Sequence, residues 1–295
     1  MAVFTQLSLH EAQEIGEAYA FDIMHIQAIS EGITNSNFVV QLRNGSVCIL
    51  TIIEQHTLAE TTPIIDLIKH LPNEIPHAKI YKTNQQKSFH TYKNKPVIMS
   101  QYLIGKSIDK PTNEQIAQIA TTMAYLHQTK PEFKIQNKRN INWMQAIANN
   151  VMDKLSSDDQ TLLQQSLDEI QQADFNHLSK SIIHHDLFRD NALFYNTNLN
   201  GIIDFYYACF DFTLIDIAIV INDWCFDKPQ LFLDPYQKHY ALQKDTLDLL
   251  PLFRRYACLN FWLSRLSDFH FPKCKGHTTI KSPNEMKNKL IILKQ

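Results

Sequence analysis

Three polar residues in the second half of the chain have types and a spacing that suit phosphoryl transfer. Asp186 and Asn191 lie in the segment Ile183 to Phe194, and Asp204 ends the apolar run Gly-Ile-Ile that follows. A carboxylate such as Asp186 can accept the proton of an attacking hydroxyl. An amide oxygen and a second carboxylate, here Asn191 and Asp204, can hold the Mg²⁺ that accompanies ATP. This segment therefore predicts an ATP-dependent kinase reaction with Asp186 as the base and Asn191 and Asp204 as metal ligands.

The residues around this set are expected to hold it in place. Apolar residues bracket each motif, which predicts short buried strands joined by a rigid loop. His184 and His185 would point to opposite faces of an extended segment, so we interpret His184 as a brace for the loop and not as a metal ligand. Asp216 lies on an apolar predicted helix, where an unpaired carboxylate would be costly. We expect it to accept backbone N–H groups of the catalytic loop.

A metal-dependent phosphohydrolase of the His-Asp type is the rival enzyme class for His185 and Asp186. Such a site needs the His-Asp pair on a helix, with further His and Asp ligands on other helices. The residues around His185 are β-like, which argues against this alternative.

The remaining sequence predicts an α+β protein with two lobes. Asn44-Gly45 between two β-like runs is a strong hairpin signal. Strands are expected at 37–42, 47–53 and 95–103, and helices at 9–19, 63–71, 113–128, 143–155, 158–172, 212–224, 234–242 and 246–269. We therefore predict a small β-rich lobe at 1–103 that binds the nucleotide. A larger, mainly helical lobe at 104–295 would carry catalysis and substrate binding.

Composition favours a cytoplasmic protein with a small-molecule partner. The chain has 295 residues with 28 basic and 30 acidic side chains, so nothing indicates a nucleic-acid or membrane-surface partner. The first residues lack the pattern of a secretory signal, and no apolar run is long enough to span a bilayer. The five cysteines are scattered, which fits reduced thiols better than disulfides or a zinc site. The sequence does not indicate an oligomeric state.

Two short segments of the first lobe are candidates for nucleotide contacts. Asn35, Ser36 and Asn37 follow a lone glycine and could donate hydrogen bonds to phosphate oxygens. Such Asn- and Ser-rich stretches are also common in plain turns. Ser100 and Tyr102, at the lobe boundary, could offer backbone groups to an adenine, although an ordinary strand has the same sequence pattern.

Two charged residues of the helical lobe are candidates for binding an amino-acid substrate. Arg265 can grip a carboxylate with two parallel hydrogen bonds, and Asp223 could meet an ammonium group. Asp268 lies three residues after Arg265 on the same helix face, so a surface ion pair is the alternative interpretation.

With these residues in view, the chain resembles the aminoglycoside phosphotransferase and choline kinase superfamily, and within it the bacterial homoserine kinases. The His-x-Asp and Ile-Asp-Phe elements mark the superfamily. The strings Phe-Arg-Asp-Asn at 188–191, Asn-Asp-Trp-Cys at 222–225 and Trp-Leu-Ser-Arg-Leu at 262–266 indicate the homoserine kinases. The resemblance implies a two-lobed protein-kinase-like fold, ATP and Mg²⁺ as cofactors, and conversion of L-homoserine to O-phospho-L-homoserine, a step of threonine synthesis.

The chain departs from the superfamily pattern at two positions. His185 stands where the superfamily usually has Gly, and Thr51 stands where kinases carry a lysine for the ATP phosphates. Phosphate charge would then be handled by Mg²⁺, the loop at 35–37 and backbone dipoles. Two alternatives stay open: a kinase of another small alcohol, such as choline, methylthioribose or an aminoglycoside, and a non-catalytic nucleotide-binding relative.

Overall fold

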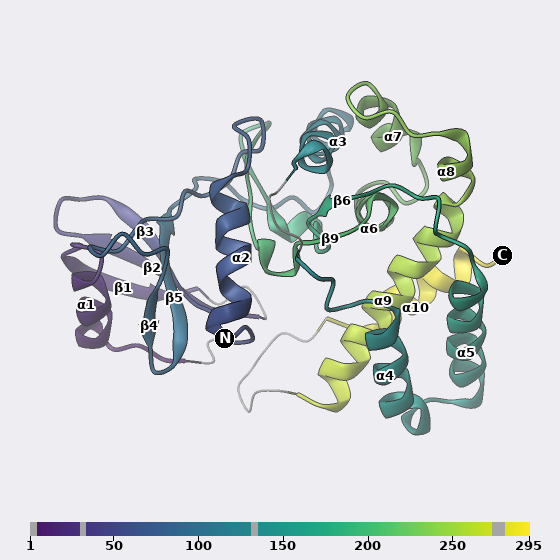
Figure 1. The fold of residues 1–295 in the computed structure, drawn as a ribbon, viewed down its shortest axis with the longest axis horizontal. Coiled ribbons are helices and arrows are strands. Elements are labelled where there is room, and N and C mark those ends of the chain that lie inside the picture. Colours follow the sequence, from purple (N-terminus) through teal and green to yellow (C-terminus); the bar gives the residue numbers. More distant parts are fainter. Residues whose placement is uncertain (1–4, 30–33, 131–134, 273–280) are drawn as a thin grey trace. The chain divides into compact units, whose positions relative to one another are not determined.

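The structure, a computed structural model, describes residues 5–29, 34–130, 135–272 and 281–295. These residues divide into two compact units, one comprising 5–29, 34–71 and 76–104, and the other comprising 72–75, 105–130, 135–272 and 281–295. The first unit is rich in strands and the second in helices (Figure 1). The α+β class predicted from the sequence is thus confirmed. No helix among the described residues is long and apolar enough to cross a membrane.

The first unit is built on one antiparallel sheet with the strand order β1-β2-β3-β5-β4. Its strands are β1 (Ile23–Ala28), β2 (Ser36–Leu42), β3 (Val47–Ile52), β4 (His90–Tyr92) and β5 (Lys95–Gln101). The predicted hairpin joins β2 to β3, and Gly45 supplies the left-handed backbone of its turn with φ of 85°. Helix α1 (Leu9–Glu17) packs Ala12 and Ile15 into the core of this sheet.

The second unit surrounds two short antiparallel ribbons with helices. Strand β6 (Lys180–Ile183) pairs with β9 (Cys209–Phe212), and β7 (Ala192–Tyr195) pairs with β8 (Asn198–Ile202). The helices are α3 (Asn113–Gln128), α4 (Ile141–Val151), α5 (Ser157–Gln172), α6 (Thr213–Trp224), α7 (Gln230–Gln237), α8 (Lys244–Asp248), α9 (Leu250–His270) and α10 (Pro283–Ile292). Helix α9 contacts α4, α5, α6 and α10, and it forms the spine of this unit (Figure 1).

Some element boundaries differ from the sequence prediction for identifiable reasons. Helix α2 (Leu58–Lys69) begins five residues before the predicted start at Pro63, because Thr57 and Glu60 form a reciprocal capping box. The predicted helix at 246–269 is divided, since Pro251 occupies the first turn of α9 and α8 ends just before it. Among the described residues the four cysteines Cys48, Cys209, Cys225 and Cys258 are buried free thiols.

Candidate active site

The backbone that leads to Asp186 is held by Asp216. Strand β6 ends at Ile183, and α6 places the buried carboxylate of Asp216 beneath the next two residues. Its Oδ2 accepts the amide of His184 and its Oδ1 accepts the amide of His185, each at 2.7 Å. His185 has a left-handed backbone with φ of 64°, a conformation that glycine adopts without strain.

Asp216 is itself the centre of a buried polar chain that reaches α7. Nε2 of His127, on α3, lies 3.2 Å from Oδ2 of Asp216, and the hydroxyl of Tyr236 lies 2.7 Å from Nδ1 of His127. Burial alone would raise the pKa of Asp216, but the hydrogen bond with His127 and the backbone amide of His184 hold it below its ordinary value. The carboxylate therefore stays ionised, as its role as a double acceptor requires.

His184 ties this loop to the segment that carries Asp204. Its Nε2 lies 2.9 Å from the carbonyl oxygen of Ile203, and its ring lies 4.6 Å from that of Phe205. Burial lowers the pKa of His184, so the ring is neutral and the nitrogen facing the carbonyl can carry the donating hydrogen. His184 thus bridges the residues before Asp186 and those around Asp204.

Asp186, Asn191 and Asp204 come together as the spacing implied. Nδ2 of Asn191 donates to the carbonyl oxygen of Asp186 at 2.7 Å and lies 3.3 Å from its Oδ2. The amide of Ile203 donates to the carbonyl oxygen of Asn191 at 3.0 Å, so the β7–β8 hairpin brings its two ends together. Asp204 follows β8 with a left-handed backbone, φ of 65°.

Burial raises the pKa of both Asp186 and Asp204. It raises the pKa of Asp186 to about 7, with Arg139 opposing the shift and Asp204 adding to it. It raises the pKa of Asp204 to about 6, with the charge of Asp190 adding to it. A carboxyl whose pKa lies near neutrality is well matched to accepting a proton during reaction.

The same cluster fits a single hard cation bound together with a phosphate ligand. Among the described residues no group of three or more His, Cys, Asp or Glu side chains could hold a metal ion. Mg²⁺ that accompanies ATP needs only one or two protein oxygens, because phosphates and waters supply the others. Oδ1 of Asp204 is buried and makes no hydrogen bond, so this oxygen has its lone pairs directed at no protein donor. The side-chain Nδ2 of Asn191 donates to Asp186. Its side-chain oxygen, Oδ1, is the atom that could join Asp204 on a cation.

The two predicted substrate residues each have a protein partner. Asp223 accepts three hydrogen bonds from Arg189, namely from its amide (2.8 Å), Nε (3.0 Å) and Nη2 (3.2 Å). Arg265 is buried and donates from Nη1 to Glu285 of α10 at 2.8 Å and to the carbonyl oxygen of Ser282 at 3.1 Å. A substrate would have to share these groups with their present partners.

The predicted nucleotide residues lie in the first unit, and several of them bond within it. The hydroxyl of Ser36 donates to Glu54 at 2.6 Å, and Oδ1 of Asn35 accepts the amide of Glu54 at 3.1 Å. Thr51, which we expect at the position of the usual kinase lysine, donates its hydroxyl to Oδ1 of Asn37 at 2.7 Å. Gly32 and Ile33 of the predicted phosphate loop lie outside the described residues.

The two predicted adenine residues differ in their surroundings. Ser100 lies inside β5, opposite Ile49 of β3. Tyr102 follows β5 and is exposed. The contacts of both residues with a nucleotide remain a prediction.

The sequence analysis did not identify Arg139, which lies in the loop before α4. Its Nη1 is 3.9 Å from Oδ1 of Asp186, and its guanidinium carbon stacks 3.5 Å from the ring centroid of Tyr207. Arg139 precedes Asp186 by 47 positions and belongs to no motif, so only the folded chain brings it to this site.

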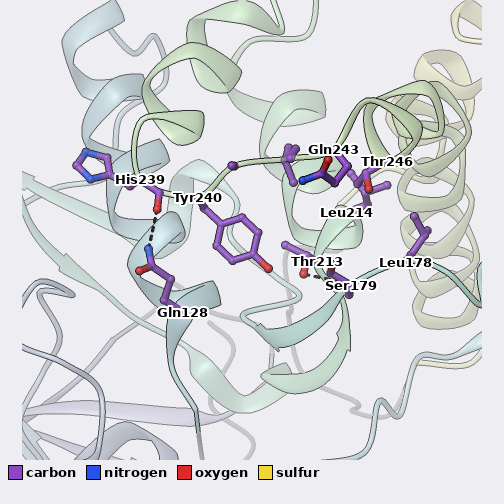
Figure 2. Close-up of a pocket in the computed structure, with 11 residues that line it drawn as sticks. Gln128, Leu178, Ser179, Thr213, Leu214, His239, Tyr240, Gln243 and Thr246 are labelled. Atoms are coloured by element: carbon purple, nitrogen blue, oxygen red, sulfur yellow. Dashed lines mark hydrogen bonds between the residues drawn. The ribbon is translucent and has the colours of Figure 1, made fainter.

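A cavity of about 360 Å³ lies elsewhere in the second unit. Figure 2 shows Tyr240 and His239 on one side of it and Thr213 and Ser179 on another. Nε2 of Gln128 donates to the carbonyl oxygen of His239 at 3.1 Å across its wall. None of the residues predicted to act in catalysis or binding lines this cavity, so we assign it no part in the reaction.

Comparison with known proteins identifies the family of the chain. The model of the phosphotransferase enzyme family matches residues 25–253. Homoserine kinase of Methylobacillus flagellatus is 34% identical over 295 aligned residues, which cover 96% of this chain and 92% of that protein. Homoserine kinase of Neisseria meningitidis is 31% identical, with coverage of 99% and 100%. The chain therefore belongs to the phosphotransferase enzyme family.

Solved structures of similar proteins identify the fold. An amicoumacin kinase in complex with AMP-PNP and Ca²⁺ has a TM-score of 0.71 at 14% identity, covering 96% of this chain and 91% of that one. A spectinomycin phosphotransferase in complex with ADP and spectinomycin has a TM-score of 0.69 at 14% identity, with coverage of 98% and 95%. The kinase-like fold predicted from the sequence is confirmed. The protein is an ATP-dependent kinase, as its family and its nearly full-length relatives establish.

Proposed function

We propose that this kinase phosphorylates the side-chain hydroxyl of L-homoserine, using Mg·ATP and producing O-phospho-L-homoserine. The observation that carries the reaction is the approach of Asn191 to Asp186, with Asp204 brought to the same place by the β7–β8 hairpin. The choice of acceptor is supported by relatives named homoserine kinase that align over nearly the whole chain. The small-molecule kinases among the solved structures support ATP as the donor, because two of them were determined with ADP or AMP-PNP.

In this proposal Asp186 orients the acceptor hydroxyl and takes its proton as the oxygen attacks the γ-phosphate. Its backbone is fixed by the bonds of Asp216 to the two preceding amides, so the carboxylate needs little reorganisation before reaction. Asn191 and Asp204 would hold Mg²⁺, which neutralises charge on the transferred phosphoryl group when it is bound. Ca²⁺ in a solved relative supports a divalent cation in general, and Mg²⁺ is our assignment.

The binding residues complete the proposal. Asn35, Ser36, Asn37, Ser100 and Tyr102 would contact the nucleotide. Asp223 would bind the ammonium group of the substrate while it also pairs with Arg189. Arg265 would bind the carboxylate group of the substrate while it also pairs with Glu285.

The proposal is tested by ADP release from purified protein with Mg·ATP. L-homoserine, D-homoserine, L-threonine, choline, methylthioribose and an aminoglycoside are offered in parallel. We expect turnover largely confined to L-homoserine, and a loss of about 10²–10⁴-fold in kcat for Asp186→Ala. Full activity of Asp186→Ala would refute the role of this residue. Turnover of a different alcohol would preserve the kinase mechanism and discard homoserine as the substrate.

A further inference from the structure

The backbone of Arg139 is fixed by hydrogen bonds to two asparagine side chains. Its amide donates to Oδ1 of Asn137 at 2.7 Å, and its carbonyl oxygen accepts from Nδ2 of Asn260 on α9 at 2.7 Å. Asn137 also donates to Asp211 in β9 at 2.7 Å. One helix and one strand therefore fix the backbone from which this side chain extends.

The guanidinium group of Arg139 is also held in place by two aromatic rings. It stacks on the ring of Tyr207, three residues after Asp204, and its carbon lies 5.5 Å from the ring centroid of Phe261 on α9. Only 11% of the Arg139 side chain is exposed. Burial opposes its charge, but Tyr207 and Asp186 hold the pKa of Arg139 above its ordinary value, so it remains a cation.

One donor of this buried cation has nothing to bond to. Nη1 of Arg139 is buried and makes no hydrogen bond, and the 3.9 Å to Oδ1 of Asp186 is too long for one. An unsatisfied buried donor on a charged group is costly and is rarely retained without a ligand or a water to meet it. The donor is directed at the carboxylate that we assign as the base.

We propose that Arg139 binds the α-carboxylate of the amino-acid substrate, as a second cation besides Arg265, while the substrate hydroxyl lies at Asp186. This inference rests on the function proposed above and names the group that recognises its substrate. The hydroxyl and carboxylate of a four-carbon hydroxy amino acid are roughly 4–6 Å apart, from ordinary bond lengths. A molecule of this size can place its hydroxyl on Asp186 and its carboxylate on a guanidinium whose Nη1 lies 3.9 Å away.

Charge around the site supports a carboxylate ligand. Asp186 and Asp204 are both buried acids. The negative charge of Asp268 also interacts with Arg139 and raises its pKa. The carboxylate of a zwitterionic amino acid would be repelled by these acids unless a cation met it, and Arg139 is the cation beside the base. Choline and an aminoglycoside have no carboxylate to meet this cation, so Arg139 would favour an amino acid over them. The γ-phosphoryl group is the other anion that could meet Arg139, and the experiment separates the two.

The test compares L-homoserine with 3-aminopropan-1-ol, which keeps the amine and the primary hydroxyl but lacks the carboxylate. Values of kcat and KM are measured for both with the intact wild-type protein and with Arg139→Gln and Arg139→Lys. A charge-assisted hydrogen bond lost from a bound carboxylate corresponds to about a 10- to 150-fold loss of kcat/KM. We expect Arg139→Gln to lose this factor for L-homoserine, mainly through KM, and to change kcat/KM for 3-aminopropan-1-ol less than about 3-fold. Arg139→Lys should recover part of the loss.

Equal losses for both acceptors would overturn the proposal and assign Arg139 to the phosphoryl group. Unchanged kcat/KM for L-homoserine in Arg139→Gln would also overturn it. Arg255→Gln is the matched control, since this part-buried arginine of the same unit bonds Glu169 instead. Failure of the proposed function is recognised separately, because the wild-type protein would then not turn over L-homoserine at all.

Discussion

Oδ1 of Asp216 accepts a 2.7 Å hydrogen bond from the amide of His185, the residue directly before the proposed base. Its other oxygen accepts the amide of His184. An asparagine in this place has one acceptor oxygen and turns an NH₂ group toward an N–H donor. We therefore expect Asp216→Asn to lower kcat by about 10²-fold, because a misplacement of the base by about 1 Å costs that much.

Asp216→Asn should also lower the free energy of unfolding by about 3–5 kcal/mol, since it removes one member of a buried charged network. Steady-state kinetics and chemical unfolding measure the two effects. Asp234→Asn, an exposed position on α7, serves as the control and should change neither quantity appreciably. Wild-type kcat in a folded Asp216→Asn protein would contradict the positioning role.

Asp223 offers a second prediction, because Arg189 already occupies its carboxylate from three donors. If Asp223 also meets the substrate ammonium, Asp223→Ala should raise KM for L-homoserine by about 10-fold or more and leave KM for ATP within about 3-fold. Arg189→Ala keeps the carboxylate and removes its partner. An equal rise of KM in Arg189→Ala would show that Asp223 acts only by holding Arg189.

Arg265 is tested against its partner Glu285 in the same way. The structure joins the two at 2.8 Å between α9 and α10, so Arg265→Ala should lower stability and, if the arginine also binds substrate, raise KM for L-homoserine alone. Glu285→Gln weakens the same ion pair while keeping the guanidinium. KM for L-homoserine should therefore rise in Arg265→Ala and stay unchanged in Glu285→Gln. The same KM in the wild-type protein and both variants would exclude the substrate role of Arg265.

The Arg265–Glu285 pair also predicts a response to acid. Burial alone would raise the pKa of Glu285, but hydrogen bonds from Lys289 and Arg265 lower it to about 2, below the ordinary value of 4.5. The folded protein then binds fewer protons than the unfolded chain between these values. The stabilisation from Glu285 is complete above pH 4.5 and is lost as the pH falls toward 2. Glu285→Gln should show a smaller loss of stability over this window when unfolding is followed by circular dichroism.

Local patterns allowed much of this site to be predicted, and the rest depends on contacts between distant segments. Asp186, Asn191 and Asp204 lie within 19 residues of one another on strand-forming sequence, so their clustering follows from short-range rules. Asp216 could be assigned a role because an isolated carboxylate on an apolar helix must find donors. Arg139 could not, since its position depends on Asn260 of α9 and on Tyr207, which lie far along the chain from it. The partners of Arg265 and Asp223 were missed for the same reason.

His185 gives the last prediction, which uses both its backbone and its burial. Its φ is 64°, and its ring is almost fully buried with Nε2 making no hydrogen bond. Burial, with the charge of Arg139, lowers the pKa of His185 from 6.5 to about 3. Between these values the unfolded chain binds a proton that the folded protein does not. The contribution of His185 to the free energy of unfolding therefore falls as the pH drops below 6.5.

His185→Asn removes this titration and keeps a residue that tolerates the left-handed backbone. Each pH unit in the window corresponds to at most about 1.4 kcal/mol, so between pH 7 and pH 5 the variant should gain up to about 2 kcal/mol relative to wild type. Urea unfolding at the two pH values measures the gain. His185→Ala should show the same gain, because it also removes the imidazole. If the stability difference between wild type and either variant is the same at both pH values, the imidazole is not the group that makes the fold sensitive to acid.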